Sequence, residues 1–248
     1  MLTSDNPLKN LLLASSSTIY SRGYLDHIEN DIREQLCGVQ RVAFVPFALY
    51  DRDAYATKAG GRFHQMGFAL ESVHSASAPK QLIEEADAIF IGGGNTFRLL
   101  KALYDYDLLE TIRDRVEKGV PFIGSSAGSI VACPTLKTTK DMPVVEPPSF
   151  NALGLVSFQI SPHYLDSDPN STHMGETQEV RIMQYLEEND LPVVGLREAT
   201  VLHVNEGVVS LRGDTTARIF RRGAPPVEVS PGSNLAEDAT FATARRTQ

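Results

Sequence analysis

The stretch FIGSSAGS, residues 122–129, joins an apolar run typical of a buried strand to small and apolar residues that can begin a helix. It contains the pattern Gly-x-Ser-x-Gly with Ser126 at its centre. In a nucleophile elbow, a serine occupies a strained strand-to-helix turn, and glycines two residues away on either side relieve the crowding. The backbone N–H after the serine then lies at the positive end of a helix, where it can stabilise an oxyanion. The pentapeptide alone is equally compatible with a plain tight turn, so the rest of the chain has to decide.

Strand-like and helical segments alternate along most of the chain. Short apolar runs followed by turn residues predict further strands at 10–15, 41–46, 68–73, 88–91, 155–160 and 192–196. Helical spacing of apolar residues predicts helices at 24–36, 51–66, 79–86, 97–103, 108–118 and 175–188. This alternation predicts an α/β fold with a mostly parallel sheet, helices on both faces, and ligand chemistry at the carboxyl ends of the strands.

The C-terminal part of the chain has a different pattern. Short strands separated by turns, at 200–204, 208–211 and 217–220, predict an antiparallel meander that caps the edge of the sheet. We expect a single α/β domain over residues 1–229. The tail over 230–248 is rich in Pro, Gly, Ser, Asn and Thr, so we expect it to be partly disordered.

Composition narrows the classes of partner and compartment. The 248 residues include 31 acidic and 23 basic side chains, and the net charge of −8 disfavours a surface that follows nucleic-acid phosphates. Cys37 and Cys133 lie far apart, which fits a reducing compartment and, for Cys133, a small buried thiol. The N-terminus lacks a signal-peptide pattern, and no apolar run is long enough to span a membrane. We therefore expect a cytoplasmic protein that binds neither nucleic acid nor membrane.

A glycine-rich loop, GGGNT at residues 92–96, directly follows the predicted strand 88–91. Its backbone amides can approach a ligand closely and can serve as donors to a phosphate or to an oxyanion. The patterns of dinucleotide-binding and P-loop proteins are both missing, so we do not expect a nucleotide. An oxyanion role requires a strand order that places this loop beside the serine turn.

One histidine stands out among the six in the chain. His163 comes just after a predicted strand and behind Pro162, which is where a general base would lie if that strand neighbours the serine turn. Two carboxylates can orient such a histidine: Asp141 in a turn-rich excursion, and Glu198 at the end of the predicted strand 192–196. A serine, a histidine, a carboxylate and backbone donors are the groups that acyl transfer to serine requires.

Several blocks, in this order, resemble the peptidase E family of serine dipeptidases, also called α-aspartyl dipeptidases. They are IGGGNTF (91–97), GSSAG (124–128), ACPT (132–135), TTKDMP (138–143) and PH (162–163), and the similarity spans about residues 11–220. The resemblance implies a flavodoxin-like fold akin to class I glutamine amidotransferases. It also implies hydrolysis of dipeptides whose first residue is aspartate, with no metal and no other cofactor.

The resemblance assigns roles to matching positions. Ser126 becomes the nucleophile and His163 the base. Asp141 and Glu198 both match positions proposed for the third member, and the choice between them stays open. Glu198 ends a predicted core strand and is better placed to orient the histidine, whereas Asp141 can instead fix the loop or bind the amino group of the substrate. The oxyanion would be bound by two backbone N–H groups, that of Ala127 and that of Gly93 or Gly94.

One position departs from the family in a way that affects specificity. The acidic-substrate enzymes carry Gly-Glu-Thr-Arg after the histidine, whereas this chain has GETQ at 175–178. An arginine can pair bidentately with a carboxylate; Gln178 cannot, but it can exchange hydrogen bonds with a side-chain amide. The sequence thus predicts a substrate-binding Gln178, a weakened preference for Asp and acceptance of Asn, unless Arg181 or Arg98 supplies the missing charge.

Three other functions compete with this interpretation. A glutamine amidotransferase would need a cysteine nucleophile and usually a carboxylate two residues after the histidine, where this chain has Ser126 and Leu165. A cyanophycinase-like peptidase shares the elbow and the fold, and would act on a long β-linked polymer. A non-catalytic amidotransferase-like binding protein would fit a broken triad. We expect a small peptide substrate and a monomer or homodimer.

Overall fold

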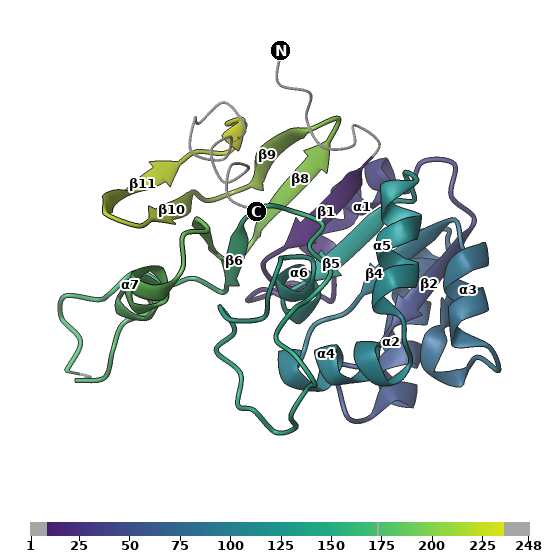
Figure 1. Cartoon of the computed structure of the whole chain (residues 1–248). Helices are drawn as coiled ribbons and strands as arrows, with labels where there is room; N and C mark the ends of the chain where they lie inside the picture. Colours follow the sequence, from purple (N-terminus) through teal and green to yellow (C-terminus); the bar gives the residue numbers. More distant parts are fainter. Residues whose placement is uncertain (1–8, 173, 236–248) are drawn as a thin grey trace, which may run out of the picture.

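The computed structural model describes residues 9–172 and 174–235, and its largest element is a seven-stranded sheet (Figure 1). The strand order is β3-β2-β4-β5-β1-β8-β9. These strands are β1 (Asn10–Ala14), β2 (Arg41–Val45), β3 (Ala69–Ser72), β4 (Ala88–Ile91), β5 (Phe122–Ser125), β8 (Thr200–Asn205) and β9 (Val208–Gly213). Pairing is parallel from β3 to β1 and antiparallel from β1 to β9. The predicted α/β fold with a mostly parallel sheet is confirmed.

Helices cover both faces of this sheet. They are α1 (Glu29–Gln35), α2 (Arg52–Gln65), α3 (Pro79–Glu85), α4 (Thr96–Asp105), α5 (Leu109–Glu117) and α6 (Ala127–Val131), with short 3-10 turns η1 (Asp26–Ile28) and η2 (Val73–Ser75), whereas α7 (Gln178–Glu188) packs against the second sheet described below. Successive residues of a strand point to opposite faces. In β1, Leu12 packs in a cluster with residues of α1 and α2, whereas Leu11 and Leu13 pack in a cluster with residues of α3 to α6. The central strands are apolar on both sides because helices bury both faces.

The loop after β4 lies beside the serine turn. Strands β4 and β5 pair in parallel, with Ile91 opposite Gly124. Residues 92–95 and Ser126 therefore leave the sheet from adjacent strand ends. This is the strand order on which an oxyanion role for the glycine-rich loop depended.

A second sheet of four strands has the order β11-β10-β7-β6 and lies to the left of the main sheet in Figure 1. Its strands are β6 (Gln159–Pro162), β7 (Val193–Leu196), β10 (Ala217–Arg221) and β11 (Ala224–Val229). The C-terminal antiparallel strands are thus divided between two sheets rather than forming one meander, because β8 and β9 extend the main sheet while β10 pairs with β7. Strand β11 was not expected; its prolines, Pro225 and Pro226, are tolerated because the strand lies at a sheet edge.

The two sheets share one apolar cluster, which includes Leu13 of the main sheet and Val194 and Ile219 of the second. Residues 230–235, the start of the expected tail, pack against β9: Ser210 forms a bridge with Asn234, and Leu235 is buried. The remainder of that tail, 236–248, lies outside the described residues. None of the helices within the described ranges has the length and apolar character needed to cross a membrane.

Candidate active site

Ser126 occupies a backbone conformation that a serine rarely adopts, with φ of 52° and ψ of −108°. It is the residue between β5 and α6, and its N–H donates to the Ala14 carbonyl at 3.0 Å. The flanking glycines are required by close packing. A Cβ at Gly128 would lie 2.1 Å from the Ile91 oxygen, and one at Gly124 would lie 2.7 Å from the Gly128 oxygen. The local geometry is that of a nucleophile elbow.

Three side chains form a line of contacts at this turn. The Ser126 Oγ lies 2.9 Å from the His163 Nε2, and the His163 Nδ1 lies 3.2 Å from the Glu198 Oε1. The histidine and glutamate side chains are 42% and 50% exposed, so both the ring and the carboxylate are open to solvent. A ring proton on Nδ1, directed at the glutamate, would leave Nε2 to accept from the serine hydroxyl, which is the arrangement of a general base.

His163 reaches Ser126 from the second sheet, not from a strand beside β5. Strand β6 pairs with β7, with Pro162 opposite Leu196. His163 and Glu198 therefore follow neighbouring strand ends, which brings their side chains together. The condition set from the sequence, that the strand before the histidine neighbours the serine strand, is not met. Instead the short helix α6 packs against β6, so the histidine turn meets the serine turn across that helix.

The backbone of His163 is also unusual, with φ of 50°, and it is held by Ser15. The His163 N–H donates to the Ser15 Oγ at 2.9 Å, and the Ser15 hydroxyl donates to the Leu196 carbonyl at 2.8 Å. Ser15 is fully buried at the end of β1. Sequence reasoning missed this residue, because a serine after a strand carries no sign of a partner 148 positions away.

The two candidate carboxylates have different partners. Whereas Glu198 contacts the histidine ring, the Asp141 Oδ2 accepts from the Thr96 N–H at 2.7 Å, the Thr96 hydroxyl at 2.6 Å and the Thr139 hydroxyl at 3.0 Å. Thr96 is the first residue of α4, so the Asp141 carboxylate accepts a hydrogen bond from a backbone N–H at a helix N-terminus, where negative charge is favourable. In this structure Asp141 fixes the excursion after α6 to the glycine-rich loop.

Backbone donors surround the space next to Ser126. Ala127 begins α6, so its N–H has no acceptor within the helix. Gly93 packs so closely that a Cβ there would lie 3.1 Å from the Ser126 Cβ. Burial raises the pKa of the Tyr55 hydroxyl, which packs against this loop. Gly93 and Gly94, the latter with φ of 137°, both stay candidates for the second donor.

Two of the residues expected to contact the substrate, Gln178 and Arg181, lie on the histidine side of the site. Gln178 begins α7 and shares a small cavity of about 90 Å³ with Lys140 and Arg181. The Arg181 guanidinium lies 3.8 Å from the Glu176 carboxylate and is 57% exposed. Arg98 lines a different cavity of about 650 Å³, where its guanidinium lies over the Tyr50 ring. Gln178 and Arg181 are thus together, and Arg98 is apart from them.

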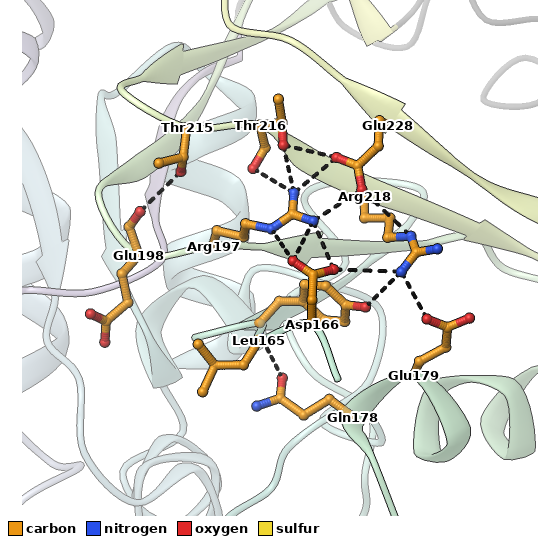
Figure 2. A network of polar contacts seen from close by, with 11 residues as sticks. Leu165, Asp166, Gln178, Glu179, Arg197, Glu198, Thr215, Thr216, Arg218 and Glu228 are labelled. Atoms are coloured by element: carbon orange, nitrogen blue, oxygen red, sulfur yellow. Dashed lines mark hydrogen bonds and ion pairs between the residues drawn. The ribbon is translucent and has the colours of Figure 1, made fainter. Parts of the chain in front are cut away.

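A network of arginines and carboxylates fixes the strand ends behind the site (Figure 2). Arg197 donates to both oxygens of Asp166 and to Glu228, and Arg218 donates to Glu179. These contacts join the segment after His163 to β7, β10, β11 and α7. The carboxylate of Glu198 points away from this network in Figure 2 and so stays available to the histidine. No sequence pattern indicates this network, since its members come from five separate segments.

Cys133 and two other histidines have surroundings that do not involve Ser126. Cys133 is fully buried, and burial raises the pKa of its thiol to about 12, which confirms the interpretation as a buried thiol. The His27 ring is hydrogen-bonded to the Ser16 carbonyl, and the His74 ring lies between Ser72 and Asp53. His173 lies outside the described residues.

Comparison with known proteins shows the family. The model of peptidase family S51 matches residues 11–212. This chain belongs to that family. The S51 match supports a serine-type peptidase, as expected from the elbow. Peptidase E of Streptomyces coelicolor is 51% identical over 228 residues, which cover 92% of this chain and 94% of that protein. A protein of Drosophila melanogaster named probable alpha-aspartyl dipeptidase is 43% identical over 230 residues, 92% of this chain and 96% of its own length.

A solved structure shares the fold of this S51 chain. The crystal structure of a peptidase from an acI-B1 Actinobacterium superposes with a TM-score of 0.68, at 17% identity, over 91% of this chain and 96% of that one. At that identity the likeness concerns the fold alone. It agrees with the arrangement of sheets and helices described above.

Proposed function

We propose that this S51 chain is a dipeptidase that hydrolyses dipeptides beginning with Asp or Asn through an acyl-enzyme on Ser126. The observation that carries the proposal is the line of contacts from Ser126 to His163 to Glu198, at 2.9 and 3.2 Å. The names of the relatives, peptidase E and alpha-aspartyl dipeptidase, support the substrate class. Glu198, rather than Asp141, is proposed as the residue that orients the histidine.

In the first half-reaction, the Ser126 Oγ attacks the carbonyl carbon of the peptide bond while the His163 Nε2 takes its proton. The N–H groups of Ala127 and of either Gly93 or Gly94 stabilise the oxyanion. Collapse breaks the C–N bond, and the imidazolium gives its proton to the leaving amino group. In the second half-reaction, water attacks the ester, His163 takes a proton from it, and the first residue leaves as the free acid while Ser126 regains its proton.

The contacts of Gln178 bear on the choice between Asp and Asn. Its Oε1 accepts from the Leu165 N–H and from Lys140, both at 3.1 Å, and its Nε2 donates to the His163 carbonyl at 3.1 Å. A primary amide has two N–H donors, so one remains for a substrate. A single donor can serve an Asp carboxylate or an Asn side-chain oxygen alike. We therefore propose that both first residues are accepted, without the strong charge discrimination of an arginine.

A panel of dipeptides with varied first residues and a constant leucine tests this function. Asp-Leu and Asn-Leu are expected to be hydrolysed with kcat/KM values within about tenfold of each other, and Ala-Leu and Lys-Leu much more slowly. Ser126→Ala is expected to be folded and inactive on all of them. An active Ser126→Ala protein would refute the mechanism, and a preference for Asp of more than about 100-fold would refute the proposed role of Gln178.

A further inference from the structure

The segment 138–141 crosses the candidate site from the glycine-rich loop to the histidine turn. Its side chains contact two different parts of the site. Thr139 and Asp141 contact Thr96 at the start of α4, with oxygen–oxygen distances of 3.1 and 2.6 Å. Thr138 donates to the Ile160 carbonyl at 2.7 Å, on the strand that ends at the histidine. The two halves of the site are thus connected through one short piece of chain.

Lys140 is the residue of this segment that meets the histidine turn. Its Nζ donates to the Pro162 carbonyl at 2.6 Å, to the His163 carbonyl at 3.2 Å and to the Gln178 Oε1 at 3.1 Å. An ammonium group has three N–H donors. All three have acceptors here, so none is left for a substrate, and the contacts of the group are with the backbone that carries the base.

Gln178 completes the same arrangement from α7. Its Nε2 donates to the His163 carbonyl, and its Oε1 accepts from the Leu165 N–H. The backbone from 162 to 165 is therefore held on one side by two side chains that also contact each other. This restraint is needed, because His163 has φ of 50°, a region that non-glycine residues leave unless their surroundings hold them.

We propose that Lys140 is a positioning residue for His163: with Gln178 it holds the strained histidine turn so that Nε2 faces Ser126, and residues 138–141 tie the general base to the oxyanion loop. The proposal rests on the proposed function, because it takes His163 as the base. Beyond Ser126, His163 and Glu198, the proposal requires an ammonium group that binds the backbone carbonyl groups of the histidine turn.

The proposal predicts that kcat depends on the charge state of Lys140 and therefore on pH. Loss of water around the ammonium lowers the pKa of Lys140 to about 8, while Asp141 raises it and Arg181 lowers it. A neutral amine has two N–H donors, so one of the three contacts is lost as pH rises through that value. The wild-type kcat is therefore expected to fall above about pH 8, and this alkaline limb is expected to be missing in Lys140→Met.

The first experiment compares Lys140→Met with Lys118→Met. Lys118 is exposed and follows α5, away from the histidine turn. We expect Lys140→Met to lower kcat by about 10- to 100-fold with KM changed less than about threefold, and Lys118→Met to match the wild type. A wild-type kcat and pH profile in Lys140→Met overturns the proposal.

Chemical rescue separates positioning from misfolding. In a Cys37→Ser background, Lys140→Cys treated with 2-bromoethylamine gains a thioether analogue of lysine, while buried Cys133 is shielded. Recovery of at least half of the lost kcat supports the proposal, and no recovery in a fully modified, folded protein overturns it. The rate of Ser126 labelling by a small fluorophosphonate reports serine activation without any dipeptide. If the dipeptide panel fails but labelling still depends on Lys140, the substrate assignment fails and the positioning role stands.

Discussion

At the scale of single residues, the two candidate carboxylates are expected to respond differently to neutralisation. Glu198→Gln keeps the shape but removes the charge that stabilises the imidazolium and fixes the histidine tautomer, so kcat is expected to fall about 100-fold or more with little change in Tm. Asp141→Asn removes a charge that accepts three hydrogen bonds at the start of α4, so it is expected to lower stability by about 1–3 kcal/mol. Steady-state kinetics and thermal unfolding of both variants distinguish the roles; the reverse pattern would assign the orienting role to Asp141.

The contacting residues Ser126, His163 and Glu198 could be predicted as site candidates because each follows a strand that is recognisable from its own apolar run. Ser126 lies in a local motif, and His163 and Glu198 come just after the ends of β6 and β7. The choice of Glu198 over Asp141 could not be made, since it depends on how β6 and β7 pair. Ser15 and Lys140 were missed for the same reason: their partners are backbone groups of a distant turn, and backbone groups leave no trace in a sequence.

At the scale of elements, the elbow is expected to tolerate no Cβ at its second glycine. Gly128→Ala would place a carbon 2.1 Å from the Ile91 carbonyl oxygen, at the crossing of α6 and β4. We expect a loss of about 1–3 kcal/mol in the free energy of unfolding, or about 2–12 °C in Tm for a chain of this size. Gly61→Ala is the matched control, because Gly61 lies inside α2 with open space around its Cβ position, and alanine there is expected to raise stability by about 0.5–1 kcal/mol. Equal Tm shifts in both variants would show that packing at the elbow is looser than described.

Helices and strands of the main sheet could be predicted because both faces of the sheet are buried, which gives each central strand a continuous apolar run. Strands at a sheet edge, or with prolines, lack such a run. Strand β6 begins four residues later than the expected 155, and β11, with the sequence APPVEV, was not predicted at all. Both lie at the edges of the second sheet, where pairing with one neighbour sets the limits of the strand and apolar character does not.

At the scale of the whole molecule, the allocation of strands to two sheets decides how the site is built. The short α6 packs against both β5 and β6, so Ser126 comes from one sheet while His163 and Glu198 come from the other. No local pattern encodes this division, because β8 (TVLHVN) and β10 (ARIFR) are both short strands with apolar and polar residues mixed, yet they pair in different sheets. The network around Arg197 is what holds the second sheet in register with the segment that follows the histidine.

From the contacts of Arg197 we predict that part of the free energy of unfolding is lost in acid. Hydrogen bonds from Arg197 hold the pKa of Glu228 below its usual value. A carboxyl group with a lowered pKa in the folded state stabilises the fold above its unfolded pKa, and the contribution disappears as pH falls through the folded pKa. Because the Glu228 side chain is 50% exposed, solvent screening keeps its part to about 1 kcal/mol. Arg197→Met lacks this contribution already at neutral pH, so its deficit relative to the wild type is expected to be largest near pH 7 and to shrink below about pH 4.

Urea unfolding of the wild type and of Arg197→Met at pH 7 and at pH 3.5 measures this difference. Arg222→Met is the matched control, because Arg222 pairs with Asp190 where the two side chains are 55% and 87% exposed. Such a pair is expected to contribute less than about 0.5 kcal/mol at either pH. If Arg197→Met is destabilised equally at both pH values, its contribution comes from the packing of its side chain, which lies over the Tyr164 ring, and not from the carboxylates. If the loss of stability in Arg197→Met is smaller in acid, the contribution of Arg197 comes from its ion pairs. The same ion pairs then connect the segment after His163 to the second sheet.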